Sequence, residues 1–267
     1  MSYFRDKVAL VTGSSSGLGR VIAQGFADAG TKVVIVGLEE GESERVADEM
    51  RSAGHDAIGL TANVMQQADV DRLFAEAIEH FGRLDVLVNN AGRSMRGKIL
   101  DTTPDQFRDL IELNLIATVR CTRAAVPHLL ENRGHVINIG SLAAKSASRW
   151  VGAYPASKHA VAAYSQQLRL ELSSEGLHVL LVCPGPISRD DPRLYPLEGL
   201  EDIPESARKP GAGVKVSTIP PERLTRAILR ACERRRPEIV MPAKARLLFA
   251  IAQLFPSLGD WIVLRKT

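Results

Sequence analysis

VALVTGSSSGLG, residues 8–19, is the stretch of sequence that decides the fold. Its first five residues predict a buried strand, its glycines and serines predict a tight turn, and a helix is expected from about Gly17 to Ala29. Such a turn brings backbone N–H groups and the positive end of a helix dipole toward one point, which suits a pyrophosphate. The same glycines would also serve a turn that binds nothing. The spacing, Gly-x3-Gly-x-Gly, differs from the common Gly-x-Gly-x-x-Gly fingerprint of dinucleotide-binding proteins.

Outward from this stretch, short apolar runs alternate with helical patterns along most of the chain. Strands that are apolar throughout are buried on both faces, so a parallel sheet with helices on both sides is expected. The sequence predicts a single-domain α/β fold, a Rossmann-like doubly wound parallel sheet of about seven strands. Further strands are expected at 32–36, 57–62, 84–88, 134–140, 178–183 and 238–241, and further helices at 42–53, 67–81, 105–131, 153–175 and 221–235.

Two segments depart from this alternation. Residues 186–219 are rich in proline and charge and read as a long functional or mobile loop. Residues 244–267 form an amphipathic C-terminal extension of the domain at 1–243. Packing of this tail on the domain or on a partner chain is the favoured interpretation, with peripheral membrane contact as the alternative because basic residues flank it.

Composition narrows the function classes. The 267 residues include 34 Lys and Arg against 31 Asp and Glu, a net charge of +3, which gives no reason to expect a nucleic-acid partner. Arginines do cluster at 230 and 234–236, and we interpret them as a solvated helix end. Three widely spaced cysteines with no nearby histidine predict a reduced protein without a metal site. The first residues do not resemble a signal peptide, so a cytoplasmic location is expected.

Tyr154 and Lys158 stand four residues apart on the predicted helix at 153–175. Positions i and i+4 share one helix face, so the phenol and the ammonium would point into the same space. A nearby ammonium favours phenolate over phenol and lowers the tyrosine pKa, which prepares the phenol to exchange a proton with an alcohol or carbonyl oxygen. A solvated lysine beside a half-buried tyrosine is the structural alternative.

Three motifs in this order resemble the short-chain dehydrogenase/reductase family. They are the pattern TGxxxGxG at 12–19, Asn89-Asn90-Ala91-Gly92 after the fourth strand, and Tyr154-x3-Lys158, and the resemblance runs from about residue 5 to 242. It implies an NAD- or NADP-dependent oxidoreductase that transfers a hydride between nicotinamide and a carbonyl or secondary alcohol.

The resemblance also implies a catalytic tetrad of Asn114, Ser141, Tyr154 and Lys158. Tyr154 would be the general acid or base, and Ser141 would hold the substrate oxygen beside it. Lys158 would lower the pKa of Tyr154 and bind the nicotinamide ribose, and Asn114 would hold a water that relays protons to Lys158. Taken alone, Ser141 would be a turn or cap serine, and Asn114 a helix kink or a core hydrogen bond.

The cofactor contacts implied by the resemblance come from several loops. With Tyr154 and Lys158, they are Gly13, Ser15, Ser16, Gly17, Leu18, Gly19, Asn63, Val64, Asn90, Ala91, Gly92, Pro184, Gly185 and Ile187, and Ser188 is a further donor to a phosphate. The choice between NAD and NADP stays open, because Gly37 and Leu38 replace the acidic or basic residue that usually decides it.

Substrate and partners follow from the same resemblance. A small carbonyl or alcohol is expected, with an apolar one favoured because NNAGRSMRG at 89–97 resembles members that act on lipophilic carbonyls; Ser94, Met95 and Trp150 are the expected pocket neighbours. A homodimer or homotetramer formed through helices 105–131 and 153–175 is expected. A catalytically idle binding protein, or an epimerase or dehydratase on a related scaffold, are the alternatives.

Overall fold

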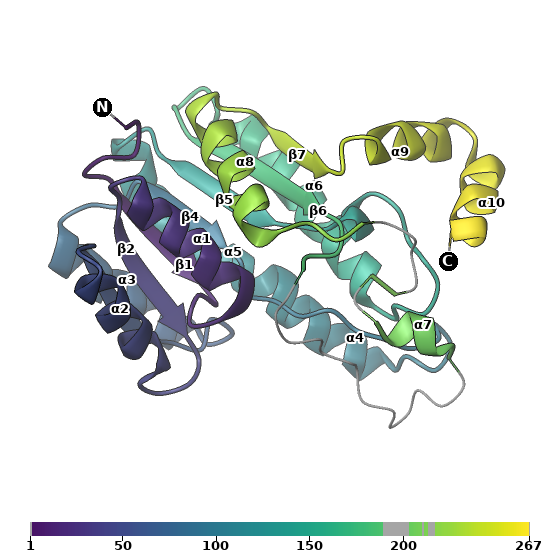
Figure 1. The fold of residues 1–267 in the computed structure, drawn as a ribbon, viewed down its shortest axis with the longest axis horizontal. Helices are drawn as coiled ribbons and strands as arrows, with labels where there is room; N and C mark the ends of the chain where they lie inside the picture. Colours follow the sequence, from purple (N-terminus) through teal and green to yellow (C-terminus); the bar gives the residue numbers. More distant parts are fainter. Residues whose placement is uncertain (1, 189–202, 210, 213–216, 267) are drawn as a thin grey trace.

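The computed structural model describes residues 2–188, 203–209, 211–212 and 217–266 and has one seven-stranded parallel sheet (Figure 1). The strand order is β3-β2-β1-β4-β5-β6-β7, and every pairing is parallel. The predicted fold class is therefore confirmed. The strands are β1 Val8–Thr12, β2 Lys32–Gly37, β3 Ala57–Thr61, β4 Val86–Asn89, β5 His135–Ile139, β6 His178–Pro184 and β7 Glu238–Met241.

The strands are apolar throughout because their alternate residues enter two different cores. Ala9 and Val11 of β1 pack on the side covered by α1, α2 and α8, whereas Val8 and Leu10 pack on the side covered by α3 and α5. Successive side chains of a strand point to opposite faces, so both sets must be apolar. The helices are α1 Gly17–Asp28, α2 Glu42–Ser52, α3 Gln67–Phe81, α4 Pro104–Ile111, α5 Ala117–Glu131, α6 Tyr154–Leu172, α7 Glu205–Arg208, α8 Pro221–Glu233, α9 Ala245–Leu254 and α10 Pro256–Lys266.

The order of the strands places the glycine loop where the direction of winding of the sheet reverses. β1, β2 and β3 run outward to one edge of the sheet, and β4 then returns to the other side of β1. The carboxyl ends of β1 and β4 therefore lie next to each other where the winding reverses. Ligands of doubly wound sheets bind in the crevice at such a point.

One element differs from its prediction. The helix expected over 105–131 consists of α4, a π-helical turn at Glu112–Ile116 and α5. The turn is centred on Asn114, whose side chain is 1% exposed. A π turn holds one residue more than an α turn, and such turns occur frequently at functional sites.

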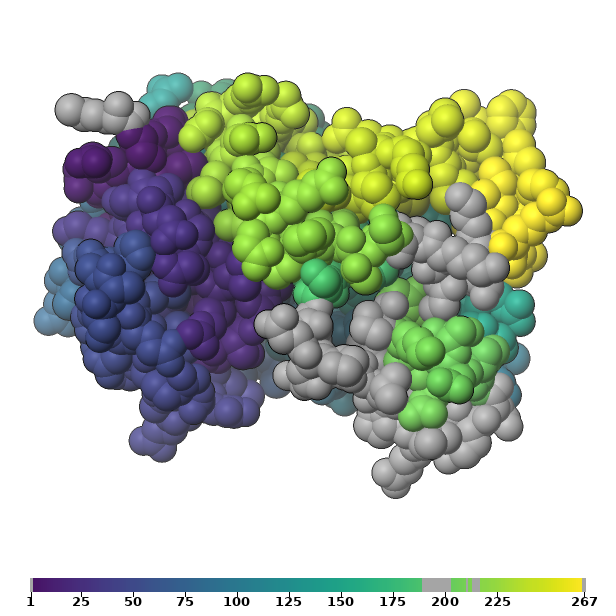
Figure 2. Space-filling model, in the orientation of Figure 1, coloured from purple at the N-terminus to yellow at the C-terminus, as the bar shows by residue number. Residues whose placement is uncertain are grey.

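The C-terminal tail forms α9 and α10, which project from one end of the sheet (Figures 1 and 2). The two helices pack on each other where a Cβ on Gly259 would lie 2.5 Å from the Cβ of Ala252. No residue of α9 is buried, and the exposed apolar side chains of the tail are Leu247, Leu254, Phe255, Leu258, Trp261 and Leu264. Across the described ranges, we find no helix that combines the length and apolarity needed to cross a membrane.

The predicted loop at 186–219 is described only in part. Residues 189–202, 210 and 213–216 lie outside the described residues. The described remainder includes α7 and a bridge between Ile187 and Ile219.

Candidate active site

The glycine loop leads into α1 as predicted and leaves the helix N-terminus open. Ser16 is the N-cap residue, but within the described chain its side chain makes no capping hydrogen bond, and the first turn carries no acidic residue. The first N–H groups of a helix need partners, and an uncapped N-terminus without a carboxylate suits an anion. Ser14 instead fixes the loop to the sheet, because its Oγ donates to Val11 O at 2.6 Å and accepts from Val36 N at 2.9 Å.

The Asn-Asn-Ala-Gly segment after β4 is fixed to the glycine loop by hydrogen bonds. Thr12 Oγ1 accepts from the backbone N–H groups of Asn90 and Ala91 at 3.0 Å each. Asn90 Nδ2 donates to the carbonyls of Thr12 and Gly13 at 2.9 and 3.0 Å. A Cβ on Gly19 would lie 2.2 Å from Gly13 O, so only glycine fits there. The two motifs therefore form one rigid unit.

The end of β2 packs closely against two serine side chains. A Cβ on Gly37 would lie 2.7 Å from both Ser15 Oγ and Ser43 Oγ. Ser43 is fully buried, and within the described residues its Oγ has no hydrogen-bond partner. A buried hydroxyl without a partner is costly, so Ser43 is suited to form a hydrogen bond with a polar group of a ligand. Nearby Leu38 is 67% exposed.

Tyr154 and Lys158 both lie on the first turns of α6, as predicted. The Lys158 amine is buried and donates to Ile139 O at 2.8 Å, which ties it to the carboxyl end of β5. Burial lowers the pKa of Lys158 to about 8, while the nearby Cys183 acts in the opposite direction. Lys158 is therefore buried, unlike the solvated lysine that was the structural alternative. Tyr154 itself is half-buried.

Asn114 lies close to this pair through its π turn. Its Oδ1 accepts from Arg93 N at 2.9 Å, and its Nδ2 donates to Arg93 O and to Ser157 Oγ at 3.0 and 2.9 Å. A Cβ on Gly92 would lie 2.8 Å from Asn114 Oδ1 and 3.6 Å from Lys158 Nζ. Asn114 therefore makes the core hydrogen bonds of the alternative interpretation, and it does so beside Lys158.

Two serines with predicted roles at the site already make hydrogen bonds within the protein. Ser141 caps a 3-10 turn at Leu142–Ala144, where its Oγ accepts from Ala143 N at 3.1 Å. Ser141 is thus the cap serine of the alternative interpretation. The cap uses its hydroxyl oxygen as an acceptor and leaves the hydroxyl hydrogen available. Ser188 Oγ donates to Ile219 O at 3.2 Å, so its hydroxyl hydrogen is already bound in this conformation.

The remaining predicted cofactor residues lie at the carboxyl ends of the strands. Asn63 and Val64 follow β3, and Asn63 N donates to Asp69 Oδ2 at 2.8 Å. Pro184 ends β6, and Gly185 N donates to Met241 O at 2.8 Å. Ser15, Ser16, Gly17 and Leu18 lie between β1 and the first turn of α1, and Ile187 pairs with Ile219. The structure thus gathers the predicted residues at one edge of the sheet.

Arg96 is a residue that the sequence interpretation missed. Its guanidinium donates to Ala207 O at 2.7 Å, to Lys209 O at 3.0 Å and to Met95 O at 2.8 Å, and the residue is 8% exposed. It therefore ties the loop after β4 to α7. Met95 also lies against Gly152, whose added Cβ would be 2.8 Å from Met95 Sδ, next to the backbone bridge of Gly97 and Val151.

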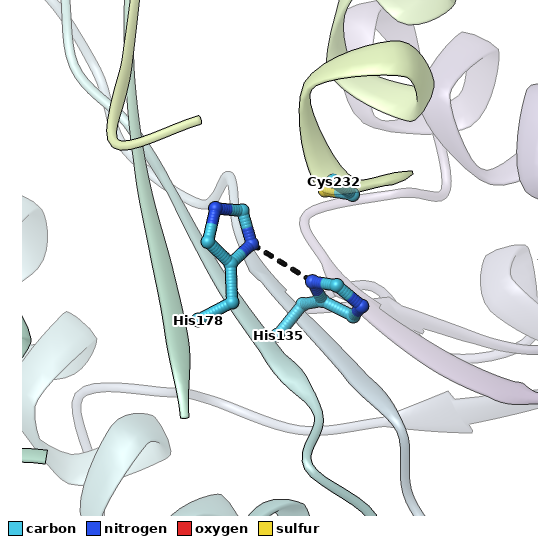
Figure 3. A group of neighbouring side chains, drawn as sticks. All are labelled: His135, His178 and Cys232. Carbon is cyan, nitrogen blue, oxygen red and sulfur yellow. Dashed lines mark hydrogen bonds between the residues drawn. The ribbon is translucent and has the colours of Figure 1, made fainter. Parts of the chain in front are cut away.

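A second group of reactive side chains lies where the strands begin, at the end of the sheet opposite the candidate active site. His135 and His178 begin β5 and β6, and Cys232 of α8 lies near them (Figure 3). Their ligand atoms lie within 4.8 Å of one another, although no spacing in the sequence indicates such a cluster.

Hydrogen bonds account for every ring nitrogen of this pair. His178 Nε2 is 2.8 Å from Arg236 O and must donate to it, so His178 Nδ1 accepts from His135 Nδ1 at 2.8 Å. His135 Nε2 then accepts from Tyr3 OH at 2.8 Å. Burial is the main cause that lowers the pKa of His178 to about 4 and that of His135 to about 2. We therefore interpret the pair as a neutral structural chain.

Comparison with known proteins agrees with this geometry. The chain is 34% identical over 260 residues to the uncharacterized oxidoreductase YxnA of Bacillus subtilis, covering 96% of this chain and 71% of that protein. It is 36% identical over 210 residues to the L-fucose dehydrogenase of Oryctolagus cuniculus, covering 78% and 72%.

A similar fold is found in a short chain dehydrogenase/reductase from Burkholderia phymatum in complex with NAD. The TM-score is 0.82 at 25% identity, covering 95% of this chain and 96% of that chain. The family model described as short chain dehydrogenase matches residues 7–191. The chain belongs to the short-chain dehydrogenase/reductase family.

Proposed function

We propose that this protein is an NAD(P)-dependent oxidoreductase that transfers a hydride between nicotinamide and a carbonyl or secondary alcohol, with an apolar substrate favoured. The observation that carries the proposal is the buried Lys158 amine one helical turn from Tyr154 and close to Gly92 and Asn114. A lysine is rarely buried without a charged partner, because removing an ammonium from water is costly, and the Lys158 amine donates to a neutral carbonyl.

The residues of the crevice fit a dinucleotide. The uncapped N-terminus of α1 offers N–H groups to a pyrophosphate, and the unpartnered Ser43 hydroxyl beside Gly37 offers a hydrogen bond at the end of β2. Glycine at 19 lets the backbone approach closely. The NAD-complexed Burkholderia phymatum protein, which has the same fold, supports this assignment. The choice between NAD and NADP is decided by titrating NADH and NADPH separately and following fluorescence.

In this mechanism the residues of the protein transfer the proton. The cofactor, when bound, supplies or accepts the hydride. Tyr154 gives its phenol proton to the carbonyl oxygen during reduction and takes it back during oxidation. Lys158, while protonated, stabilises the phenolate. Ser141 uses its hydroxyl hydrogen to hold the substrate oxygen, because its lone pair already serves Ala143 N. Asn114 fixes the backbone of Arg93 and the side chain of Ser157, next to Lys158, and a water that relays protons to Lys158 would be held there.

The test is a matched pair of substitutions on α6. Tyr154→Phe should lower kcat for a carbonyl panel by about a hundredfold or more while NAD(P)H binding persists, because only the transferable proton is removed. Tyr164→Phe makes the same change ten residues along the helix and should leave kcat unchanged. Undiminished turnover in Tyr154→Phe would exclude the proposed role of this tyrosine.

A catalytically idle cofactor-binding protein remains the second candidate, because fold alone does not establish activity. It predicts cofactor binding without turnover of any carbonyl by the wild-type protein. All four tetrad residues are present, which favours the enzyme.

The assembly that we propose is a homodimer or homotetramer that pairs α5 and α6 with those of a second copy, on a domain at 1–243 with its extension at 244–267. Sedimentation equilibrium would show two or four copies, and a monomer at micromolar concentration would contradict it. The cytoplasmic location stays a prediction.

A further inference from the structure

An open cavity of about 650 Å³ lies along the edge strand β7. Within the described chain, no residue predicted for the active site lines it, although Met241 of its lining accepts a hydrogen bond from Gly185 N. It is bordered by α8, β7 and the start of α9, which follow one another along one edge of the molecule (Figure 1). This volume lies within the range of sites that hold small molecules. Its lining includes six arginines and a single carboxylate: Arg223, Arg226, Arg230, Arg234, Arg236, Arg246 and Glu238.

Four of these arginines come from one face of α8. Arg223, Arg226, Arg230 and Arg234 are spaced by three or four residues, so their side chains follow one stripe along the helix. Ala227 and Ala231 also line the cavity, and their short side chains leave room between the guanidinium groups. Residues 230 and 234–236 are exposed, as expected of a solvated helix end, and Arg230, Arg234 and Arg236 also line the cavity.

Several other helical arginines of this protein have an acidic partner within their own helix. Arg45, Arg51, Arg72 and Arg108 each form ion pairs with carboxylates near them in sequence. Within residues 2–188, 203–209, 211–212 and 217–266, none of the six cavity arginines forms an ion pair. The one acid of the cavity, Glu238, is paired with Lys145.

The six like charges around this cavity repel one another, and the one carboxylate that lines it is already paired with Lys145. Guanidinium groups present their N–H donors in a planar fork that matches phosphate oxygens. We propose that this cavity, the arginine cavity, binds a ligand that carries at least one phosphate group and more than one negative charge. The inference does not depend on the proposed oxidoreductase activity.

A second copy of this chain is a poor occupant for the arginine cavity. Twofold pairing of identical faces would bring two sets of unpaired arginines together. The phosphate could belong to a free small molecule or to a lipid headgroup, because the exposed apolar side chains of α9 and α10 begin next to the cavity. The chemistry at the guanidinium groups is the same in both cases.

Calorimetric titration with inorganic tripolyphosphate at low ionic strength tests the site. The variant R226Q/R230Q should bind tripolyphosphate about tenfold more weakly than the wild type or worse, because two charge-assisted contacts are lost. The variant R72Q/R108Q loses the same charge elsewhere and should bind within about twofold of the wild type. Both variants keep the glycine loop, so phosphate bound there would affect them equally. R226K/R230K should bind with intermediate affinity.

Vesicles distinguish the two sources of phosphate. Co-sedimentation is measured with vesicles of phosphatidylcholine alone and of phosphatidylcholine mixed with phosphatidylglycerol in equal parts. Binding to the mixed vesicles that is lost in R226Q/R230Q and kept in R72Q/R108Q assigns a lipid headgroup. Tripolyphosphate binding with the same variant pattern, without vesicle binding, assigns a free phosphate ligand. If R226Q/R230Q and R72Q/R108Q behave alike in both assays, the proposal is wrong.

Discussion

The buried amine of Lys158 donates a 2.8 Å hydrogen bond to the main-chain carbonyl of Ile139. This bond joins the first turns of α6 to the carboxyl end of β5, so the position of the proposed catalytic lysine is set by the sheet. Because a carbonyl is not an anion, the bond supplies no charge to offset burial, and the lysine pKa falls to about 8.

The pH dependence of carbonyl reduction should report this lysine. Lys158 is protonated below its pKa of about 8, so kcat/KM should fall as pH rises through that value and the ammonium beside Tyr154 is lost. The arginine of Lys158→Arg stays charged at these pH values. The activity that this variant retains should therefore not fall as pH rises through about 8. A wild-type kcat/KM that is flat from about pH 7 to 9 would contradict the prediction.

Two buried serine hydroxyls near the glycine loop should respond to alanine in opposite ways. Ser43→Ala should leave the free energy of unfolding unchanged or raise it by about 1 kcal/mol, because its Oγ has no partner in the described chain. Ser14→Ala removes bonds to Val11 and Val36 and should lower it by about 2 kcal/mol. Urea denaturation measures both. If Ser43→Ala proved as destabilising as Ser14→Ala, Ser43 would have an internal partner.

The same Ser43 substitution should weaken cofactor-dependent stabilisation. Saturating cofactor should raise the midpoint of thermal unfolding less in Ser43→Ala than in the wild type, because a hydrogen bond to the ligand is lost. An identical shift in both proteins would place the cofactor away from this hydroxyl.

The buried histidine pair should make the protein sensitive to acid. In the unfolded chain each histidine binds a proton below about pH 6.5, whereas folded His178 does so only below about 4. The unfolded state therefore gains protons first, and the free energy of unfolding should fall by about 3 kcal/mol between about pH 7 and 4 through His178 alone. Urea denaturation at several pH values should show a smaller loss in His178→Gln. His80→Gln, at an exposed histidine, should keep the wild-type dependence; equal slopes in all three proteins would refute the assignment.

Arg96 should hold α7 in place. Arg96→Ala removes the donor to the carbonyls of Ala207 and Lys209, so the backbone amides at 203–209 should exchange hydrogen faster by about tenfold. Arg93→Ala, at an exposed neighbour whose backbone bonds to Asn114 survive, should leave that exchange unchanged. Unaltered exchange in Arg96→Ala would mean that other contacts fix α7.

The fold could be predicted because its strands are short and apolar on both faces. Val8 and Leu10 enter one core and Ala9 and Val11 the other, so the pattern of β1 alone indicates a covered parallel sheet. The π turn at Asn114 could not be predicted, because the helical periodicity of 105–131 continues on both sides of it. One extra residue in a turn leaves no mark in the composition.

The candidate site was predictable where its partners are close in sequence. Tyr154 and Lys158 lie one turn apart, so their spacing is sufficient. His135 and His178 become neighbours only through the register of β5 and β6, and Arg96 finds Ala207 111 residues further along. Such contacts depend on the finished packing and have no local signal.

The π turn of Glu112–Ile116 makes the position of a deletion matter. Because a π turn holds about one residue more than an α turn, losing one residue there would leave α4 and α5 in nearly the same phase and remove only the bulge that carries Asn114. Losing one residue within α5 would instead rotate the rest of that helix by about 100° and turn its apolar face out of the core. The segment should therefore keep its fold more readily after a one-residue deletion in the π turn than after one in α5.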